Sequence, residues 1–118
     1  MINKISKDDI ADILNIVLCI SAKDGILSDS ELEKSREEFP NFFDKKITKK
    51  ELNLIVDDFF DSDDQIEEYL DRITDDDMKH SILLLSLISA SADGLDIREN
   101  IAFQKALAIW EIKLKDIA

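Results

Sequence analysis

The 118-residue chain is long enough for one hydrophobic core and too short for two ordinary domains, so we expect a single domain over residues 1–118. Its two glycines and one proline disfavour an all-β fold, which needs such residues at its many turns. Its 27 acidic and 15 basic residues give a net charge of −12, which disfavours binding to nucleic acid or to an anionic lipid surface.

Helix starts are predicted in six places by a capping side chain that is followed three residues later by an acid or an amide. The pairs are Ser6 with Asp9, Ser28 with Glu31, Thr48 with Glu51, Ser62 with Gln65, Thr74 with Asp77, and Asp96 with Glu99. Behind these caps the apolar residues recur at helical spacing and predict helices at 7–22, 29–39, 49–61, 63–72, 75–91 and 97–114. We therefore expect an all-α, compact bundle of about six helices.

Three features refine this expectation. The run from Ile82 to Ile88 is apolar on nearly every face, so the helix around it is predicted to be the most buried element. Pro40, among several phenylalanines, is predicted to mark an irregular connection. Trp110 continues an apolar helical stripe and is predicted to anchor the core, whereas the acidic stretch from Asp57 to Asp64 reads as a solvated helix junction.

Both glycines follow an aspartate at the end of a long apolar helix, in the segments Ser21-Ala22-Lys23-Asp24-Gly25 and Ser91-Ala92-Asp93-Gly94. A capped, acid-rich helix is predicted after each turn, so helix, Asp-Gly turn and helix form an internal repeat. The second turn is one residue shorter than the first. We expect Gly25 and Gly94 to adopt positive φ as helix-terminating residues.

The two turns collect carboxylates, and hard divalent cations are bound by such oxygens. These carboxylates are Asp24, Asp29 and Glu31 in the first turn and Asp93, Asp96 and Glu99 in the second. Calcium, magnesium or manganese would suit them. Neither turn has the spacing of an EF-hand, and helix capping with ordinary turn chemistry explains the same residues without a metal.

Two copies of a helix ending in an (A/S)-x-D-G turn, followed by an acidic capped helix, resemble the TerB (tellurite-resistance) family over most of the chain. That resemblance implies a small, all-helical bacterial protein of a stress-response operon. It also implies metal binding through Asp24, Glu31, Asp93 and Glu99, and work within a membrane-associated or multi-protein complex.

The sequence does not predict an enzyme. Its one histidine, His80, lies near a helix start, and its one cysteine, Cys19, lies in an apolar helix where a small core residue is expected. With one cysteine, no membrane-length apolar run and no signal peptide, we expect a cytoplasmic protein without direct membrane insertion. Two functions remain open: a metal-responsive accessory module, or an acidic protein-interaction or immunity-like inhibitor domain in which the Asp-Gly turns are only structural.

Overall fold

The structure, a computed structural model, describes residues 5–21, 28–90 and 100–117. Most of these residues lie in six α-helices: α1 (Lys7–Ser21), α2 (Asp29–Phe42), α3 (Lys49–Asp61), α4 (Ile66–Asp71), α5 (Asp76–Ala90) and α6 (Ile101–Ile109). A short 3-10 helix, η3 (Leu114–Asp116), follows them. The predicted all-α bundle of about six helices is confirmed. Within the described ranges, no helix is both long enough and apolar enough to cross a membrane.

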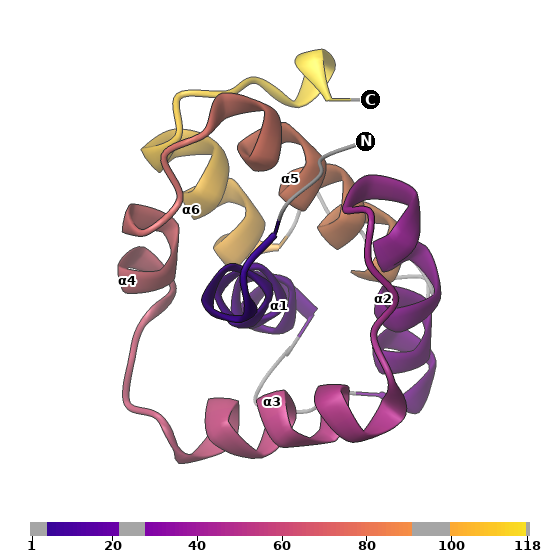
Figure 1. The fold of residues 1–118 in the computed structure, drawn as a ribbon. Helices are drawn as coiled ribbons and strands as arrows, with labels where there is room; N and C mark the ends of the chain where they lie inside the picture. Colours follow the sequence, from indigo (N-terminus) through magenta and orange to yellow (C-terminus); the bar gives the residue numbers. More distant parts are fainter. Residues whose placement is uncertain (1–4, 22–27, 91–99, 118) are drawn as a thin grey trace.

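Helix α1 is the centre of the bundle. Figure 1 views it along its axis, and it packs against α3, α4, α5 and α6. With neighbours on several sides, it buries residues over more than half of its circumference: Ile10, Ile13, Leu14, Ile16, Val17, Leu18, Ile20 and Ser21. The prediction that α5 would be the most buried helix is wrong. Helix α5 packs against α1 and α2 and leaves Leu84, Leu87 and Ile88 partly exposed.

Three of the predicted caps are confirmed because their hydrogen bonds are local and do not depend on packing. In each, the backbone N–H of the acid donates to the hydroxyl of the capping residue: Asp9 to Ser6 (3.0 Å), Glu31 to Ser28 (3.0 Å) and Glu51 to Thr48 (3.1 Å). The acid in turn accepts from the backbone N–H of the capping residue, at 3.3, 3.4 and 3.1 Å respectively. These reciprocal bonds satisfy donors that a first helical turn leaves unpaired.

The predicted start of α4 at 63, with Ser62 as its cap, is wrong. The Ser62 hydroxyl accepts from the backbone N–H of Asp64 at 3.0 Å, and α4 begins at Ile66. At that start, a carboxylate oxygen of Glu68 accepts from the Gln65 N–H at 3.1 Å. Several residues capable of capping stand side by side here, and burial of the apolar face of α4 against α1 selects among them.

The fifth and sixth helices also begin later than predicted. Asp75 rather than Thr74 caps α5, since its carboxylate accepts from the backbone N–H of Met78 at 3.0 Å. Asn100 caps α6, and its side-chain oxygen accepts from the Phe103 N–H at 2.8 Å. The predicted pair Asp96 and Glu99 lies outside the described residues.

Helix α6 ends at Ile109 rather than at the predicted 114, because Glu111 takes a left-handed conformation with φ of 54°. The Ile112 N–H donates to the Leu107 carbonyl at 3.0 Å, and the Glu111 N–H donates to the Ala108 carbonyl at 3.2 Å. This pair of bonds is a Schellman motif, which closes the helix end. Trp110 beside it is buried, which confirms the predicted core anchor.

Helix α2 runs through Pro40 to Phe42, so the prediction that it ends at 39 is wrong. Phe39 and Phe43 are both fully buried, and their ring centroids lie 4.9 Å apart. The Phe43 N–H donates to the Phe39 carbonyl at 3.0 Å. Burial of these two rings favours one more helical turn and offsets the backbone bond that proline removes.

Candidate functional site

The residues predicted to bind a metal lie mostly outside the described ranges. Asp24, Asp93 and Glu99, together with both glycines, fall in segments 22–27 and 91–99. Glu31 is described, and its side chain is buried beside Ser28. Its Oε1 accepts from the Ser28 hydroxyl at 3.1 Å and from the Ser28 N–H at 3.4 Å. The Glu31 carboxylate therefore completes the cap of α2.

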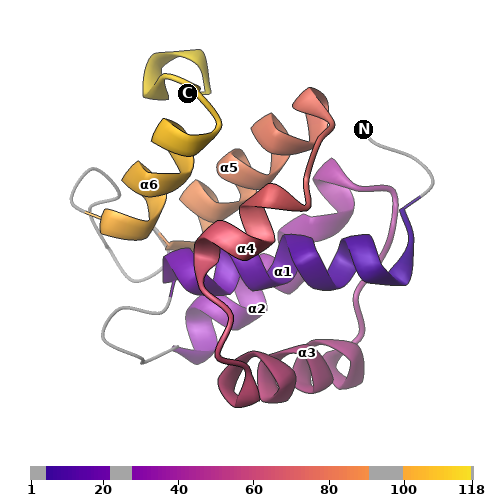
Figure 2. The same ribbon diagram turned by 90° about the vertical axis from the view of Figure 1, so that its left-hand side faces the viewer.

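A different acidic site lies where α1, α3 and α4 meet. It is a hollow of about 470 Å³, and its charged lining consists of Asp8, Asp12, Asp58, Asp64 and Arg72. Figure 2 shows α4 crossing in front of α1, with α3 below. The lining thus places four carboxylates against one guanidinium, which leaves a surplus of negative charge.

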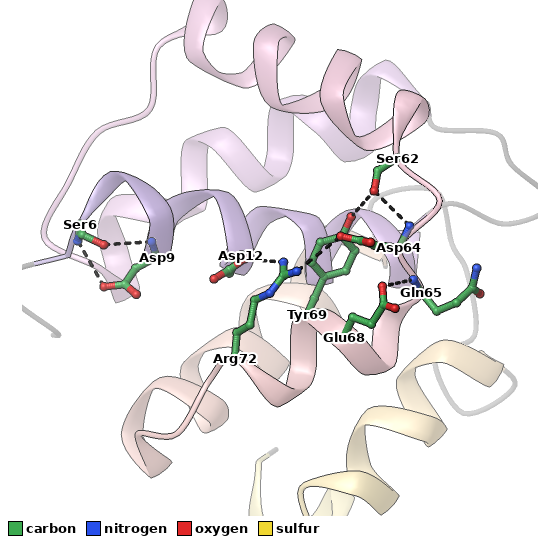
Figure 3. A network of polar contacts seen from close by, with 9 residues as sticks. All are labelled: Ser6, Asp9, Asp12, Ser62, Asp64, Gln65, Glu68, Tyr69 and Arg72. Atoms are coloured by element: carbon green, nitrogen blue, oxygen red, sulfur yellow. Dashed lines mark hydrogen bonds and ion pairs between the residues drawn. The ribbon is translucent and has the colours of Figure 1, made fainter.

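Arg72, at the end of α4, organises the hollow. Its Nη1 lies 3.3 Å from a carboxylate oxygen of Asp12 on α1, and its Nη2 lies 3.5 Å from one of Asp64 (Figure 3). Its guanidinium carbon lies 5.3 Å from the centroid of the Tyr69 ring, within cation–π range. The Tyr69 hydroxyl lies 3.4 Å from the Ser62 hydroxyl, which connects this group to the end of α3. The hydrogen bond that Arg72 donates to Asp12 raises the pKa of Arg72.

Asp12 is the least solvated carboxylate of the hollow, and its pKa is raised above the ordinary value. Burial is the main cause, and the charges of Asp9 and Asp8 add to it, whereas the hydrogen bond and charge of Arg72 oppose it. The negative charge of ionised Asp12 is thus only partly compensated by Arg72. A further positive group in the hollow would stabilise it.

Asn15 adds a second unsatisfied group to the same wall. It lies one helical turn after Asp12 and also lines the hollow. Its side-chain oxygen is shielded from solvent and accepts no hydrogen bond within the part of the chain that the structure describes. A buried acceptor without a donor is unfavourable, so Asn15 is a locally destabilising residue of this wall.

An apolar groove of about 390 Å³ adjoins the acidic hollow and shares Ser62 and Asp64 with it. Its apolar lining comes from four helices: Cys19 of α1, Phe59 and Phe60 of α3, Ile66 of α4 and Ala102 of α6. The rings of Phe59 and Phe60 meet edge to face, with centroids 5.4 Å apart. Phe60 is nevertheless 54% exposed.

The cysteine and the histidine of the chain both lie outside the lining of the acidic hollow. Burial raises the pKa of the Cys19 thiol to about 12, and the charge of Glu67 adds to this, so the thiolate is scarce at neutral pH. His80 is exposed, and its Nδ1 lies 2.9 Å from the Asp76 carbonyl of its own helix. Over the described ranges, no three His, Cys, Asp or Glu side chains are grouped so as to hold a metal ion.

Sequence reasoning did not identify the acidic hollow. The aspartates in the stretch from Asp57 to Asp64 are exposed, in keeping with the predicted solvated helix junction. The partners Asp12 and Arg72 are 60 positions apart, so no local pattern joins them. One signal was present: Arg72 is the only basic residue between Lys50 and Lys79. An isolated arginine in so acidic a segment suggests a specific carboxylate partner.

Comparison of the chain with models of protein families, with curated proteins and with solved structures gave no significant match.

Proposed function

We propose that this chain is a non-catalytic, acidic accessory module that binds a basic segment of a partner protein at the acidic hollow. The observation that carries the proposal is the lining itself, in which Asp8, Asp12, Asp58 and Asp64 face a single Arg72. A lysine or arginine from a partner would reduce the repulsion among these carboxylates.

The sequence around the hollow supports a basic partner. Residues 51–71 contain nine acids and no lysine or arginine: Glu51, Asp57, Asp58, Asp61, Asp63, Asp64, Glu67, Glu68 and Asp71. Surfaces with such a one-sided charge accelerate the approach of oppositely charged partners and reject those of like charge. Nucleic acids and anionic lipid surfaces are therefore disfavoured as ligands of this face.

The non-catalytic part of the proposal rests on the two candidate nucleophilic or basic side chains. Cys19 is held as a thiol by burial, and His80 lies exposed on the first turns of α5. Neither lines the acidic hollow.

Titration of the ¹⁵N-labelled chain with octalysine, monitored by amide chemical shifts, tests the proposal. We expect saturable shifts at Asp12, Asn15 and Arg72, with an affinity that falls as salt is raised. The double variant Asp58→Asn with Asp64→Asn should weaken binding by about threefold to tenfold, from ~0.5 kcal/mol for each exposed charge pair. Shifts spread evenly over the surface, or an unchanged affinity in the double variant, would contradict the proposal.

The matched control removes charge from another face. Glu37 is an exposed acid of α2 and does not line the hollow. Two substitutions are needed to match the charge change, so we pair Glu37→Gln with Asp29→Asn, also exposed on α2. This control should retain the octalysine affinity of the unmodified chain within about twofold, because neither residue lines the hollow and salt screens exposed charges that the ligand does not contact.

Divalent-cation binding at the Asp-Gly turns is a second candidate function, favoured by the internal repeat and by the TerB resemblance. Weak binding is expected, roughly micromolar to millimolar, because an open turn leaves water on the ion. Calcium, magnesium or manganese should raise the melting temperature and a chelator should reverse the rise, with Asp24→Asn and Asp93→Asn removing it. Amides of Gly25 and Gly94 that do not shift at millimolar cation would contradict it.

A further inference from the structure

We propose that the apolar groove beside the acidic hollow receives a large apolar side chain from a basic amphipathic helix of the partner. This inference rests on the proposed function and specifies the chemistry of its partner. Two hollows of different character share the residues Ser62 and Asp64, so a single ligand segment can occupy both. One of them is lined by four carboxylates, and the other includes the apolar side chains of Phe59, Phe60, Ile66 and Ala102 in its lining.

The groove has the size and chemistry for one apolar anchor. At about 390 Å³ it lies at the lower end of the range of ~300–1,000 Å³ for ligand pockets. Its walls are the rings of Phe59 and Phe60, the side chains of Ile66 and Ala102, and the Cys19 thiol. Because that thiol stays protonated, it behaves as a small apolar group in this wall.

One of the large exposed apolar side chains lines the groove, and another is next in sequence to a lining residue. Phe60 is 54% exposed although its ring meets that of Phe59 edge to face. Ile101, which precedes the groove residue Ala102 in α6, is 80% exposed. Exposed aromatic surface bordered by charge is typical of a protein-interaction site.

A single helix can supply both an apolar side chain for the groove and a basic side chain for the acidic hollow. Side chains three or four residues apart on one face lie ~5–6 Å from each other, so an apolar residue and a basic residue at that spacing can enter adjacent hollows. The ion pair between Arg72 and Asp64 is exposed, and its nitrogen–oxygen distance of 3.5 Å is long. Such a pair contributes little, so a partner's basic side chain can compete for Asp64 at small cost.

A second copy of the chain is a poorer occupant. An isologous dimer through this face would bring the same patch of both copies together. Each patch carries Asp58 and Asp64 beside the groove, and each chain has a net charge of −12. Like-charge repulsion therefore opposes self-association and favours a basic partner.

The test compares two synthetic helical peptides that differ only in their apolar face. Both carry the same lysines, each three or four residues from a position of the apolar face; the first has leucines at i, i+3, i+4 and i+7 of that face, and the second has serines there. The ¹⁵N-labelled full chain is titrated with each peptide and, separately, with octalysine. We expect the leucine peptide to bind at least about tenfold more tightly than the serine peptide, as expected for burial of a leucine-sized side chain. It should also shift the amides of Phe59, Ile66 and Ala102.

Two variants of α3 test whether the tighter binding of the leucine peptide comes from the groove. Phe60→Ser alters the groove, whereas Leu54→Ser makes a comparable change at a residue of the same helix that is 57% exposed and does not line it. Phe60→Ser should lower the affinity for the leucine peptide about tenfold and leave octalysine binding unchanged. Leu54→Ser should change both by less than twofold. Because both side chains are largely exposed, the two variants are expected to fold, and melting curves verify this.

The outcomes separate this inference from the proposed function. Equal affinities for the leucine and serine peptides, or equal losses in the two variants, overturn the groove assignment while octalysine binding upholds the acidic docking site. If no basic peptide shifts the α1–α3–α4 face, both proposals fail. A concentration-dependent dimer in sedimentation velocity that Phe60→Ser abolishes would overturn the partner helix in favour of a second copy.

Discussion

Replacing Leu85 with alanine should destabilise the domain far more than the same change at its neighbour Leu84. The Leu85 side chain is fully buried in α5, whereas Leu84 is partly exposed. Removing three buried carbons forfeits ~2.4 kcal/mol of transfer free energy at ~0.8 kcal/mol per carbon. The residual cavity raises the loss at Leu85 to about 3–4 kcal/mol. At Leu84, where solvent already reaches the side chain, we expect about 1–1.5 kcal/mol.

These losses are large enough to measure by thermal unfolding. An unfolding entropy of ~2.1 cal/mol/K per residue, over the 118 residues of the chain, amounts to about 0.25 kcal/mol/K. A loss of 3 kcal/mol therefore lowers the melting temperature by ~12 °C, and the Leu84 variant should melt only ~4–6 °C lower. Circular dichroism at 222 nm reports both transitions, and urea titration with an unchanged slope verifies that the unfolded states are comparable.

The matched control is Leu54→Ala on α3, where a leucine is 57% exposed and should lose less than ~0.5 kcal/mol. The reasoning is refuted if the variants of Leu84 and Leu85 melt together, since solvent exposure would then not distinguish the two faces of α5. A larger loss at Leu84 would show that α5 is rotated relative to its described packing against α1 and α2.

Three further changes test helix ends. Glu111 has φ of 54°, so Glu111→Gly should raise stability by up to ~1 kcal/mol, whereas Glu111→Val should lower the melting temperature. The Asn100 amide also donates to the Ile20 carbonyl at 2.6 Å, so Asn100→Asp, which retains the cap of α6 but removes that donor, should cost ~1–3 kcal/mol in urea titration. The hydrogen bond from the Thr48 backbone N–H lowers the pKa of Glu51. The stabilisation from this hydrogen bond is therefore present above the pKa that Glu51 has in the unfolded chain. It is lost as pH falls through the lower pKa that Glu51 has in the folded chain. The stability difference from Glu51→Gln should accordingly shrink on acidification, and a constant difference from pH 7 to ~3 would contradict this sign.

Both functional proposals require that the surplus negative charge of the acidic hollow serves partner binding rather than folding. Arg72 already neutralises part of it through Asp12 and Asp64, and both of these pairs are at least partly exposed. Exposed pairs of this kind contribute little to folding stability. We therefore expect removal of the surplus charge at Asp58 to affect partner binding more than folding.

Local sequence determined much of the secondary structure. The capping boxes at Ser28 and Thr48, with their partners Glu31 and Glu51, were predicted correctly because each is completed within four consecutive residues. The helical periodicity of the apolar residues predicted an all-α fold because that pattern is also local in sequence. Where two potential caps are adjacent, as at Thr74 and Asp75, the local preferences are nearly equal and the sequence alone did not select the right one.

Tertiary structure decided which helix is central and where the acidic hollow lies. The sequence predicts α5 as the most buried helix because the run from Ile82 to Ile88 is apolar on nearly every face. Burial depends instead on the neighbours, and within the described residues α1 packs against α3, α4, α5 and α6. The hollow needs α1 to bring Asp12 beside Arg72 and the end of α3 to add Asp58. A charge in one helix contains no information about which distant charge will face it, because that contact is set by how the apolar faces of the helices pack together.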